Sequence, residues 1–459
     1  MFRVSSGHPP SLPSIRSAIL AATLSACILV PSPAAAECRD TFSTAFVPAG
    51  APPGPGDGTP YQHLFPLGVG ASLNALVSTM NTVNTAFLSP SSSFVSAKGD
   101  AEPGYLGGGV WARAAAGWVD SKSTTTGTVD TSQARTTNFS GNPTPVSPIT
   151  GTGTCLGSLS ERYYGYQFGF DLAKLNIGGT GGNVHFGLTA GYFESRAKDE
   201  SDSSLETRTF GGPPLTLFSP AGSFESDVSV PFVGLYAAYT QGNFFIDGQV
   251  RQDFYLMNFT DPLNGLSSQS QNAYGTSAGG NVGYRVPLAA KWFVEPSAGV
   301  MWSLVKVDTI STPGSPLFQN LNAGTVNVDD IQSLLGRVSV RIGTTFASND
   351  LVWQPFITGS VFHEFADDAT ATSKIGGPVN SSTSCSGDPN CPPSGFFLNS
   401  FRNQILNTST SRIGTYSQLG IGTATVFGNT GWLAYGRADY KTGENVEGFN
   451  FNAGLRYHW

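Results

Sequence analysis

The sequence predicts an all-β protein, an antiparallel transmembrane β-barrel of about 12 strands, and three observations lead to this prediction. Only 12% of the 459 residues are charged, about half the usual share in soluble domains, whereas the chain contains 56 Gly, 31 Phe, 15 Tyr and 7 Trp. No run of about 18 apolar residues follows the N-terminal region, so no helical membrane span is expected. Apolar and polar residues alternate instead, as in the strands of a transmembrane barrel, where apolar side chains face lipid and polar ones face the lumen. A soluble β-sandwich or β-helix is the alternative.

The last strand shows the alternation most clearly. From Phe449 to Trp459 every second residue is apolar, and the residues between them are Asn, Gly, Arg and His. Side chains alternate faces along a strand, so this segment has one apolar and one polar face. In water such a chain end would promote aggregation, whereas in a barrel it is a wall strand with lipid outside and water inside.

Twelve segments have the length and the pattern of such strands. Their ranges are 109–120, 162–174, 184–198, 228–240, 243–259, 274–287, 291–308, 332–346, 351–365, 412–427, 431–440 and 447–459. An even number is expected for a bacterial single-chain barrel.

Long and short connections alternate between these segments. The long ones are 121–161, 199–227, 260–273, 309–331 and 366–411, and the short ones include Gln241–Gly242 and Gly428–Thr430. Barrels have short periplasmic turns and long external loops. The N- and C-termini of the predicted barrel domain are therefore expected in the periplasm, and the long loops are expected outside the cell.

Strand parity assigns charged residues to a wet lumen. In 243–259, for example, Asp247, Arg251 and Asp253 share the face opposite Ile246 and Val250. Trp residues such as Trp292 and Trp302 lie near strand ends, where aromatic girdles are found. The complete set of lumen candidates is Arg113, Asp171, Asp247, Arg251, Asp253, Glu295, Arg337, Arg341, Glu364 and Arg456.

The N-terminus resembles a secretory signal peptide, residues 1–36. Arg3 and Arg16 supply positive charge, an apolar core follows, and Ala34–Ala36 forms a small-residue cleavage site. This predicts export through the Sec translocon. A lipoprotein acylated on Cys27 is the alternative. Cleavage after residue 36 would leave 22 basic and 31 acidic residues, a net charge of −9, which argues against a nucleic-acid partner.

Four cysteines remain in the exported chain, and an even number suggests disulfides. Cys385 and Cys391 bracket a short, turn-rich segment that can close on itself, which leaves Cys38 and Cys155 as a second pair. No histidine lies near any of them and C-x2-C spacing is absent, so zinc binding is a poor interpretation.

Two segments precede the first strand. Residues 37–66 are rich in Pro and Gly and too few to bury a core. Within 67–104, residues 71–88 place Leu, Val, Met and Phe at helical spacing among many Ser, Thr and Asn. This favours an amphipathic helix in the wet lumen, and the alternatives are an amphipathic helix in the periplasm or a disordered spacer.

Sequence motifs for catalysis are weak, and we predict no enzyme, no cofactor and no metal site. Residues 275–279 match G-x-S-x-G, but they lie inside a strand, whereas a nucleophile elbow needs a strand-turn-helix context and a histidine. The histidines of the exported chain, His63, His185, His363 and His458, are scattered over separate segments.

Short motifs over residues 105–459 resemble, in order, the autotransporter (type V secretion) β-domain. They are GVWAR at 109–113, YQFGFD at 166–171, GLYA at 234–237 with FID at 245–247, NVGYR at 281–285, VEP at 294–296, GRVSVR at 336–341, FHEF at 362–365 and GLRYHW at 454–459. The resemblance implies a translocator barrel with a helix in the lumen. It also implies that Tyr457 and Trp459 are read by the outer-membrane barrel assembly machinery.

The resemblance favours one function among three. It implies a protein in the lipid of the outer membrane of a Gram-negative bacterium that displays a short N-terminal segment and long loops, as a surface antigen or adhesin would. Residues 37–66 would be a vestigial passenger, because the family usually carries hundreds of residues there. A porin-like channel is the second hypothesis and an outer-membrane hydrolase the third. The sequence does not identify an external ligand.

Overall fold

The computed structural model describes residues 41–44, 61–64, 69–86, 101–130, 135–137, 143–145, 150–201, 204–208, 215–219, 222–261, 266–313, 324–348, 351–375, 378–383, 396–401 and 404–459. The predicted signal peptide and Cys38, Cys385 and Cys391 lie outside these ranges, as does the side chain of Cys155.

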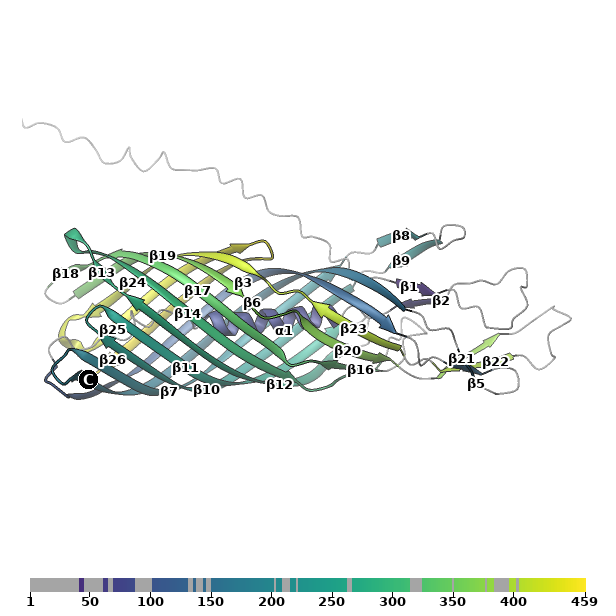
Figure 1. The fold of residues 1–459 in the computed structure, drawn as a ribbon, viewed down its shortest axis with the longest axis horizontal. Helices are drawn as coiled ribbons and strands as arrows, with labels where there is room; N and C mark the ends of the chain where they lie inside the picture. The colour runs from purple at the N-terminus through teal and green to yellow at the C-terminus, as the bar shows by residue number, and fades with distance from the viewer. Residues whose placement is uncertain are drawn as a thin grey trace, which may run out of the picture. The chain divides into compact units, whose positions relative to one another are not determined.

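Twelve antiparallel strand runs close into a barrel, which confirms the predicted fold class (Figure 1). In chain order they are β3 (Leu106–Asp130), β6 (Thr150–Ile177), β7 (Gly182–Ser201), β10 (Gly222–Gln241), β11 (Phe244–Asp261), β12 with β13 (Leu266–Tyr284, Val286–Pro287), β14 with β15 (Trp292–Val307, Ile310–Thr312), β16 with β17 and β18 (Gly324–Val328, Ile331–Thr344, Phe346–Ser348), β19 with β20 (Leu351–Glu364, Ala369–Ile375), β23 with β24 (Gln404–Thr410, Thr415–Phe427), β25 (Trp432–Gly443) and β26 (Val446–His458).

The seam of the barrel is the pairing of its last strand, β26, with its first, β3. It runs from His458 opposite Gly109 to Val446 opposite Ser121. Because β25 and β26 are short, β23 pairs with the remaining part of β3, from Thr125 to Asp130. The first strand is therefore paired on both edges over most of its length, and the barrel is closed.

The two ends of the barrel differ in their connections. At the short-turn end, β10 and β11 are joined through Gly242 (φ +57°), and β24 and β25 through the 3-10 turn η5 (Gly428–Thr430) and Gly431 (φ +77°). Glycine adopts these positive φ values without strain. A second 3-10 turn, η4 (Ala289–Lys291), precedes β14 at the same end. We call the opposite end the long-loop end.

Several strands extend further toward the long-loop end than the sequence predicted. Residues 121–130 and 150–161 were expected to be loop, but they continue β3 and β6. Parts of 309–331 and 366–411 likewise form β15, β16, β20 and β23. The error has a physical cause: the segment STTTGTV at 123–129 is polar on both faces and gives no alternation, yet β-branched Thr is favoured in strands.

Small sheets form within the long connections. β1 (Thr41–Thr44) pairs with β2 (Tyr61–Leu64), and β8 (Ser204–Arg208) pairs with β9 (Leu215–Ser219). A four-stranded sheet in the order β21, β22, β4, β5 joins two connections that are distant in sequence (Pro378–Thr383, Phe396–Phe401, Arg135–Thr137, Pro143–Pro145).

The helix α1 (Val69–Ala86) lies inside the barrel (Figure 1). Its residues pack against β3, β6, β7, β10, β20 and β23. Within the described residues, no helix combines the length and the apolar character needed to cross a bilayer.

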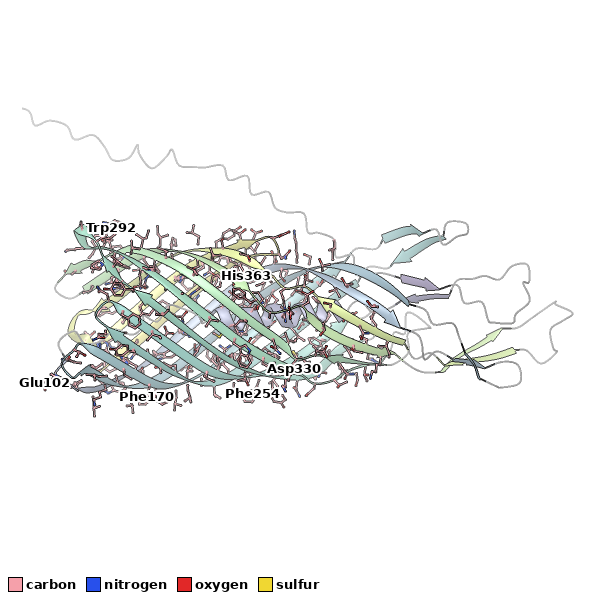
Figure 2. The ribbon with its side chains drawn as sticks, in the orientation of Figure 1. Glu102, Phe170, Phe254, Trp292, Asp330 and His363 are labelled. Carbon is pink, nitrogen blue, oxygen red and sulfur yellow. The ribbon has the colours of Figure 1, made fainter. Side chains whose placement is uncertain are left out.

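The outer face of the barrel is apolar over a broad belt. Phe170, Phe254 and Trp292 project outward, as Figure 2 shows. Beyond the belt, toward the long-loop end, the outward residues become charged: Arg196 is bonded to Asp227 at 2.5 Å. The change marks where the membrane-spanning part ends.

Glycines on the inner face allow aromatic rings to lie flat against the wall. A Cβ built on Gly169 would be 2.1 Å from the Trp111 ring, and one on Gly117 would be 2.7 Å from the Tyr163 hydroxyl. A glycine in a strand commonly marks such a close approach. The same arrangement recurs at Gly187–Tyr236, Gly191–Phe232, Gly275–Tyr255, Gly283–Phe245, Gly343–Phe293 and Gly422–Phe356. It gives a structural use for much of the high Gly and aromatic content.

Candidate functional site in the barrel lumen

All ten lumen candidates lie on the inward-facing parity of their strands. Eight of them are almost completely buried: Asp171, Arg251, Asp253, Glu295, Arg337, Arg341, Glu364 and Arg456. Arg113 and Asp247 are partly buried. The sequence assigned the face of each residue but did not predict its partners.

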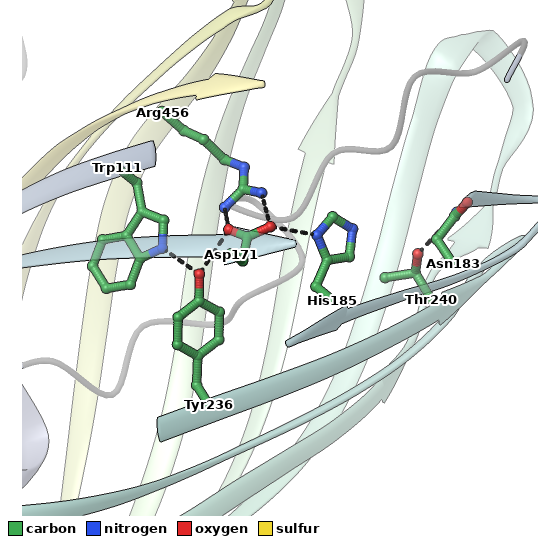
Figure 3. Close-up of polar contacts among 7 residues, drawn as sticks. All are labelled: Trp111, Asp171, Asn183, His185, Tyr236, Thr240 and Arg456. Atoms are coloured by element: carbon green, nitrogen blue, oxygen red, sulfur yellow. Dashed lines mark hydrogen bonds and ion pairs between the residues drawn. The ribbon is translucent and has the colours of Figure 1, made fainter. Parts of the chain in front are cut away.

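A cluster at the short-turn end links five consecutive strands across the seam. Arg456 of β26 forms a bidentate pair with Asp171 of β6, with Nη1 and Nη2 each 2.8 Å from a carboxylate oxygen. Nδ1 of His185, on β7, lies 2.8 Å from the same carboxylate (Figure 3). Tyr236 of β10 donates its hydroxyl to Asp171 at 2.7 Å, and Trp111 of β3 donates to Tyr236 at 2.6 Å. We call these five residues the seam cluster.

The seam cluster depends on the glycines at the start of β3. The Arg456 guanidinium reaches Asp171 by crossing over Gly109, where a Cβ would lie 2.7 Å from Nη2. The segment GGG at 107–109 thus leaves room for the last strand to contact the second one. Bidentate, charge-assisted hydrogen bonds are among the stronger hydrogen bonds in proteins. The side chains of Arg456 and Asp171 are only 1% and 0% exposed.

The C-terminal aromatics lie beside the seam cluster, on the outer face. The Trp459 amide donates to the Gly108 carbonyl at 3.2 Å, and its ring lies 6.1 Å from Phe170. Tyr457 packs against Trp432, with 5.1 Å between ring centroids. The terminal residues therefore complete the wall, which is compatible with the additional role predicted for them in assembly.

Mid-lumen arginines form ion pairs of two kinds. Some pairs join residues two apart on one strand: Arg251 with Asp253 at 2.6 Å, and Arg437 with Asp439 at 2.5 Å. Glu295 instead joins strands, because it accepts bonds from Arg341 and, at 3.0 Å, from Arg285. Buried charges need such partners.

The helix is bound to the wall through Glu161 of β6. Its Oε2 accepts hydrogen bonds from Ser78 at 2.5 Å and Thr82 at 3.1 Å, and its Oε1 accepts one from Ser195 of β7 at 2.6 Å. Closer to the short-turn end, the Asn84 side chain donates a hydrogen bond to Ser303 at 2.9 Å and accepts one from Arg251 at 3.1 Å. We call Ser78, Thr82, Glu161 and Ser195 the Glu161 cluster.

Apolar contacts surround the same helix. Leu73, Leu76, Val77, Met80 and Val83 are each at most 3% exposed. They belong to a buried cluster that includes Phe193, Phe232, Tyr255, Met257, Met301, Leu335, Phe362 and Tyr416 from the wall. The lumen around the helix is therefore packed with side chains.

Glu364 belongs to a separate cluster near the long-loop end. It accepts hydrogen bonds from Ser333 at 2.5 Å, from the Leu334 amide at 2.7 Å and from the Ala366 amide at 3.0 Å. Nearby, Arg412 donates to the Gln332 and Asp367 carbonyls at 2.7 Å. These bonds hold the short interruptions between β16 and β17, between β19 and β20, and between β23 and β24.

The part of the barrel wall that lies beyond the apolar belt, toward the long-loop end, is called the extension. Asp199 of β7 is buried in it. Burial raises the pKa of Asp199 to about 7. The nearby Asp261 raises this pKa further, whereas a hydrogen bond from the backbone of Ser158 lowers it. No comparable prediction was made from the sequence.

Sequence reasoning missed Glu161 and Tyr236, and it predicted no partner for His185. The strand containing Glu161 was predicted to begin at Arg162, so its parity was not considered. His185 and Tyr236 were visible as polar residues at inward positions, but their pairing with Asp171 depends on the register of three strands.

The motif at 275–279 lies in β12, as predicted. Ser277 is buried and donates a hydrogen bond to Asp253 at 3.3 Å. Among the described residues, no group of three His, Cys, Asp or Glu side chains is arranged to hold a metal ion.

The comparisons with known proteins agree with this architecture. A family model described as the autotransporter β-domain matches residues 150–389. The serine protease sat autotransporter of Escherichia coli O6:H1 is 25% identical over 217 residues, which are 47% of this chain and 14% of that protein. The pertactin autotransporter of Bordetella bronchiseptica is 25% identical over 306 residues, 66% of this chain and 26% of that protein. The chain thus matches about a quarter or less of these relatives' length.

The fold resembles that of a solved autotransporter structure. The transport unit of the autotransporter AIDA-I from Escherichia coli superposes with a TM-score of 0.50 at 13% identity, over 84% of this chain and 98% of that one. The β-domain of the Bordetella autotransporter BrkA gives a TM-score of 0.44 at 19% identity, over 76% and 98%. Since the family model matches more than half of the residues, the chain belongs to the autotransporter β-domain family, and its barrel is an outer-membrane translocator domain.

Proposed function

We propose that the helix-filled barrel holds the segment before α1 at the cell surface. The long-loop end would be extracellular, and the two chain termini of the barrel domain would lie on the periplasmic side. The observation that supports this most is the Glu161 cluster, because it joins a helix of the N-terminal linker to the inner wall of the barrel. A lumen packed in this way favours a translocator at rest over an open porin-like channel.

The direction of the helix supports the proposed exit. Ser78 is bonded to Glu161, in the half of β6 nearer the long-loop end, whereas Asn84 is bonded to Arg251, in the half of β11 nearer the short-turn end. The N-terminal end of α1 therefore points to the long-loop end. Residues 37–66 would leave the barrel there, as a short displayed segment, with 67–104 as the linker.

Targeting and assembly follow the family. Residues 1–36 would be removed after Sec export, and Tyr457 and Trp459 would be recognised by the barrel assembly machinery. The serine protease activity in the name of the sat autotransporter belongs to that protein. We propose no catalysis for this barrel and no cofactor.

Disulfides would restrain the surface segments. Cys155 lies opposite Thr125 in the extension, at the end where the helix exits, so a bridge to Cys38 would tether the displayed segment. Cys385 and Cys391 would close a second, local bridge. Non-reducing peptide mapping should find both pairs, and free thiols at Cys38 and Cys155 would remove the tether from the proposal.

Conductance tests the plug. Deleting residues 71–88 should raise the single-channel conductance of the purified barrel in a planar bilayer markedly, because the helix occupies the lumen. A deletion of the same length within 37–66 is the control and should leave conductance unchanged. Equal conductance in all three proteins would argue for a channel that does not use the helix as a plug.

A further inference from the structure

Two arginines face each other on the outer wall, just beyond the aromatic edge of the apolar belt. Arg162 of β6 and Arg196 of β7 are direct register partners. Both are exposed, Arg196 at 76%. The next outward residues toward the belt are Tyr164 of β6 and Glu194 of β7, which are register partners, and Trp118 of β3 is the other register partner of Arg162.

Like charges placed directly opposite each other destabilise a sheet unless an anion compensates them. Arg196 is compensated on one side, since its Nε lies 2.5 Å from Asp227 of β10. Within the described part of the chain, Arg162 has no carboxylate partner. The nearest outward acid toward the belt, Glu194, already accepts hydrogen bonds from Tyr164 and Tyr192.

Acidic residues lie on several sides of this arginine pair. On the β10 side, Asp227 is bonded to Arg196 and Glu225 is paired with Lys198 at 3.3 Å. On the opposite side, Asp120 of β3 has Ser160 and Glu447 as register partners, one outward row further from the belt than Arg162. Lys122 of β3 adds a cation beyond it.

We propose that Arg162 and Arg196 together bind a phosphate group of a membrane lipid headgroup. Guanidinium groups present paired donors that match phosphate oxygens, and residues at the aromatic edge of a barrel lie at headgroup level. The acyl chains of the same lipid would lie along the apolar outer residues of β6 and β7, such as Phe168 and Leu188. In the proposed orientation the lipid belongs to the outer leaflet.

The test is a thermal unfolding titration of the folded full-length mature chain in detergent, followed by its heat-modifiable gel mobility. The probes are bisphosphorylated lipid A, the same lipid without its phosphates, and inorganic phosphate. Phosphorylated lipid should stabilise the wild type, and Arg162→Gln should weaken this binding about tenfold or more, the expected effect of losing one charge-assisted contact. Arg162→Lys keeps the charge but not the paired donors, and should retain only part of the binding.

Lys306→Gln is the matched control, because Lys306 is an exposed cation paired with Asp330 at 3.5 Å on another part of the wall. It should behave as the wild type. Equal stabilisation of wild type and Arg162→Gln by the phosphorylated lipid would overturn the proposal. So would equal stabilisation by the dephosphorylated lipid, or by inorganic phosphate alone, since these results would assign the effect to acyl chains or to a simple anion.

Discussion

At the scale of single residues, the seam cluster shows how one ion pair can serve the closure of a barrel. Asp171 and Arg456 are 285 positions apart, yet both are at most 1% exposed and bonded to each other. Removing one partner leaves a buried charge without compensation, which costs more than removing both.

We expect Arg456→Ala to destabilise the barrel by about 3 to 5 kcal/mol, since the Asp171 carboxylate loses its bidentate partner. The double variant Asp171→Asn with Arg456→Gln should lose less, because no net charge is then buried. Unfolding in denaturant with detergent, read by heat-modifiable mobility, measures both. Equal losses in the two variants would show that charge compensation is not what the pair contributes.

Asp199 predicts a pH dependence of the extension. Its pKa rises from an ordinary value near 4 to about 7 in the folded state, so the folded protein holds this proton more tightly than the unfolded chain does. The stabilisation is fully present below about pH 4 and is lost as pH rises to about 7, by up to about 1.4 kcal/mol for each pH unit.

Asp199→Asn should remove this dependence. The measurement is hydrogen exchange of the β7–β10 extension between pH 4 and 8, corrected for intrinsic exchange rates. The wild type should open more readily at pH 8 than at pH 5, whereas the variant should not. The same pH profile in both proteins would exclude Asp199 as the cause.

At the scale of elements, strand parity places neighbouring residues of one strand on opposite faces of the barrel wall, one toward lipid and one toward the lumen. Val300 of β14 is 49% exposed on the outer face, whereas Ser297 faces inward beside Ser339. Val300→Arg should cost about 2 to 4 kcal/mol near the middle of the bilayer, and Ser297→Arg should be tolerated. Equal loss of the heat-modifiable folded form in both variants would contradict the assigned faces.

The helix offers a second prediction at this scale. Glu161→Gln removes the charge that accepts three hydroxyl hydrogen bonds, two of them from the helix. We expect more frequent brief openings in planar-bilayer recordings, because the helix is held less firmly.

Glu364→Gln is the matched control for this recording. Glu364 is also a buried carboxylate, and its hydrogen-bond partners among the described residues belong to the barrel and not to the helix. Its variant should show the baseline of the wild type. Indistinguishable traces for all three proteins would mean that the Glu161 cluster does not hold the helix.

At the scale of the whole molecule, the alternation of connections predicts sidedness. An epitope tag after Gly387 or near Ser204 should be labelled on intact cells, because both belong to connections at the long-loop end. A tag after Asn429, in the turn between β24 and β25, should be labelled only after permeabilisation. Surface labelling at Asn429 would invert the proposed orientation.

The sequence by itself determined the repeating part of this protein. Alternation with a period of two identified twelve strands and the face of residues such as Asp171 and Arg251, because parity is a local property of the chain. Helical spacing identified the helix at nearly its observed bounds, Val69–Ala86. Only its location, lumen or periplasm, could not be read from spacing.

The tertiary structure decided which inward residues meet. Glu161 with Ser78, and Arg456 with Asp171 and His185, come together through the register of neighbouring strands and the entry of the helix between them, and no local pattern encodes either. The extended hairpin of β3 and β6 was missed for the same reason: its polar strands are stabilised by pairing with each other and with β23, so their structure depends on partners distant in sequence.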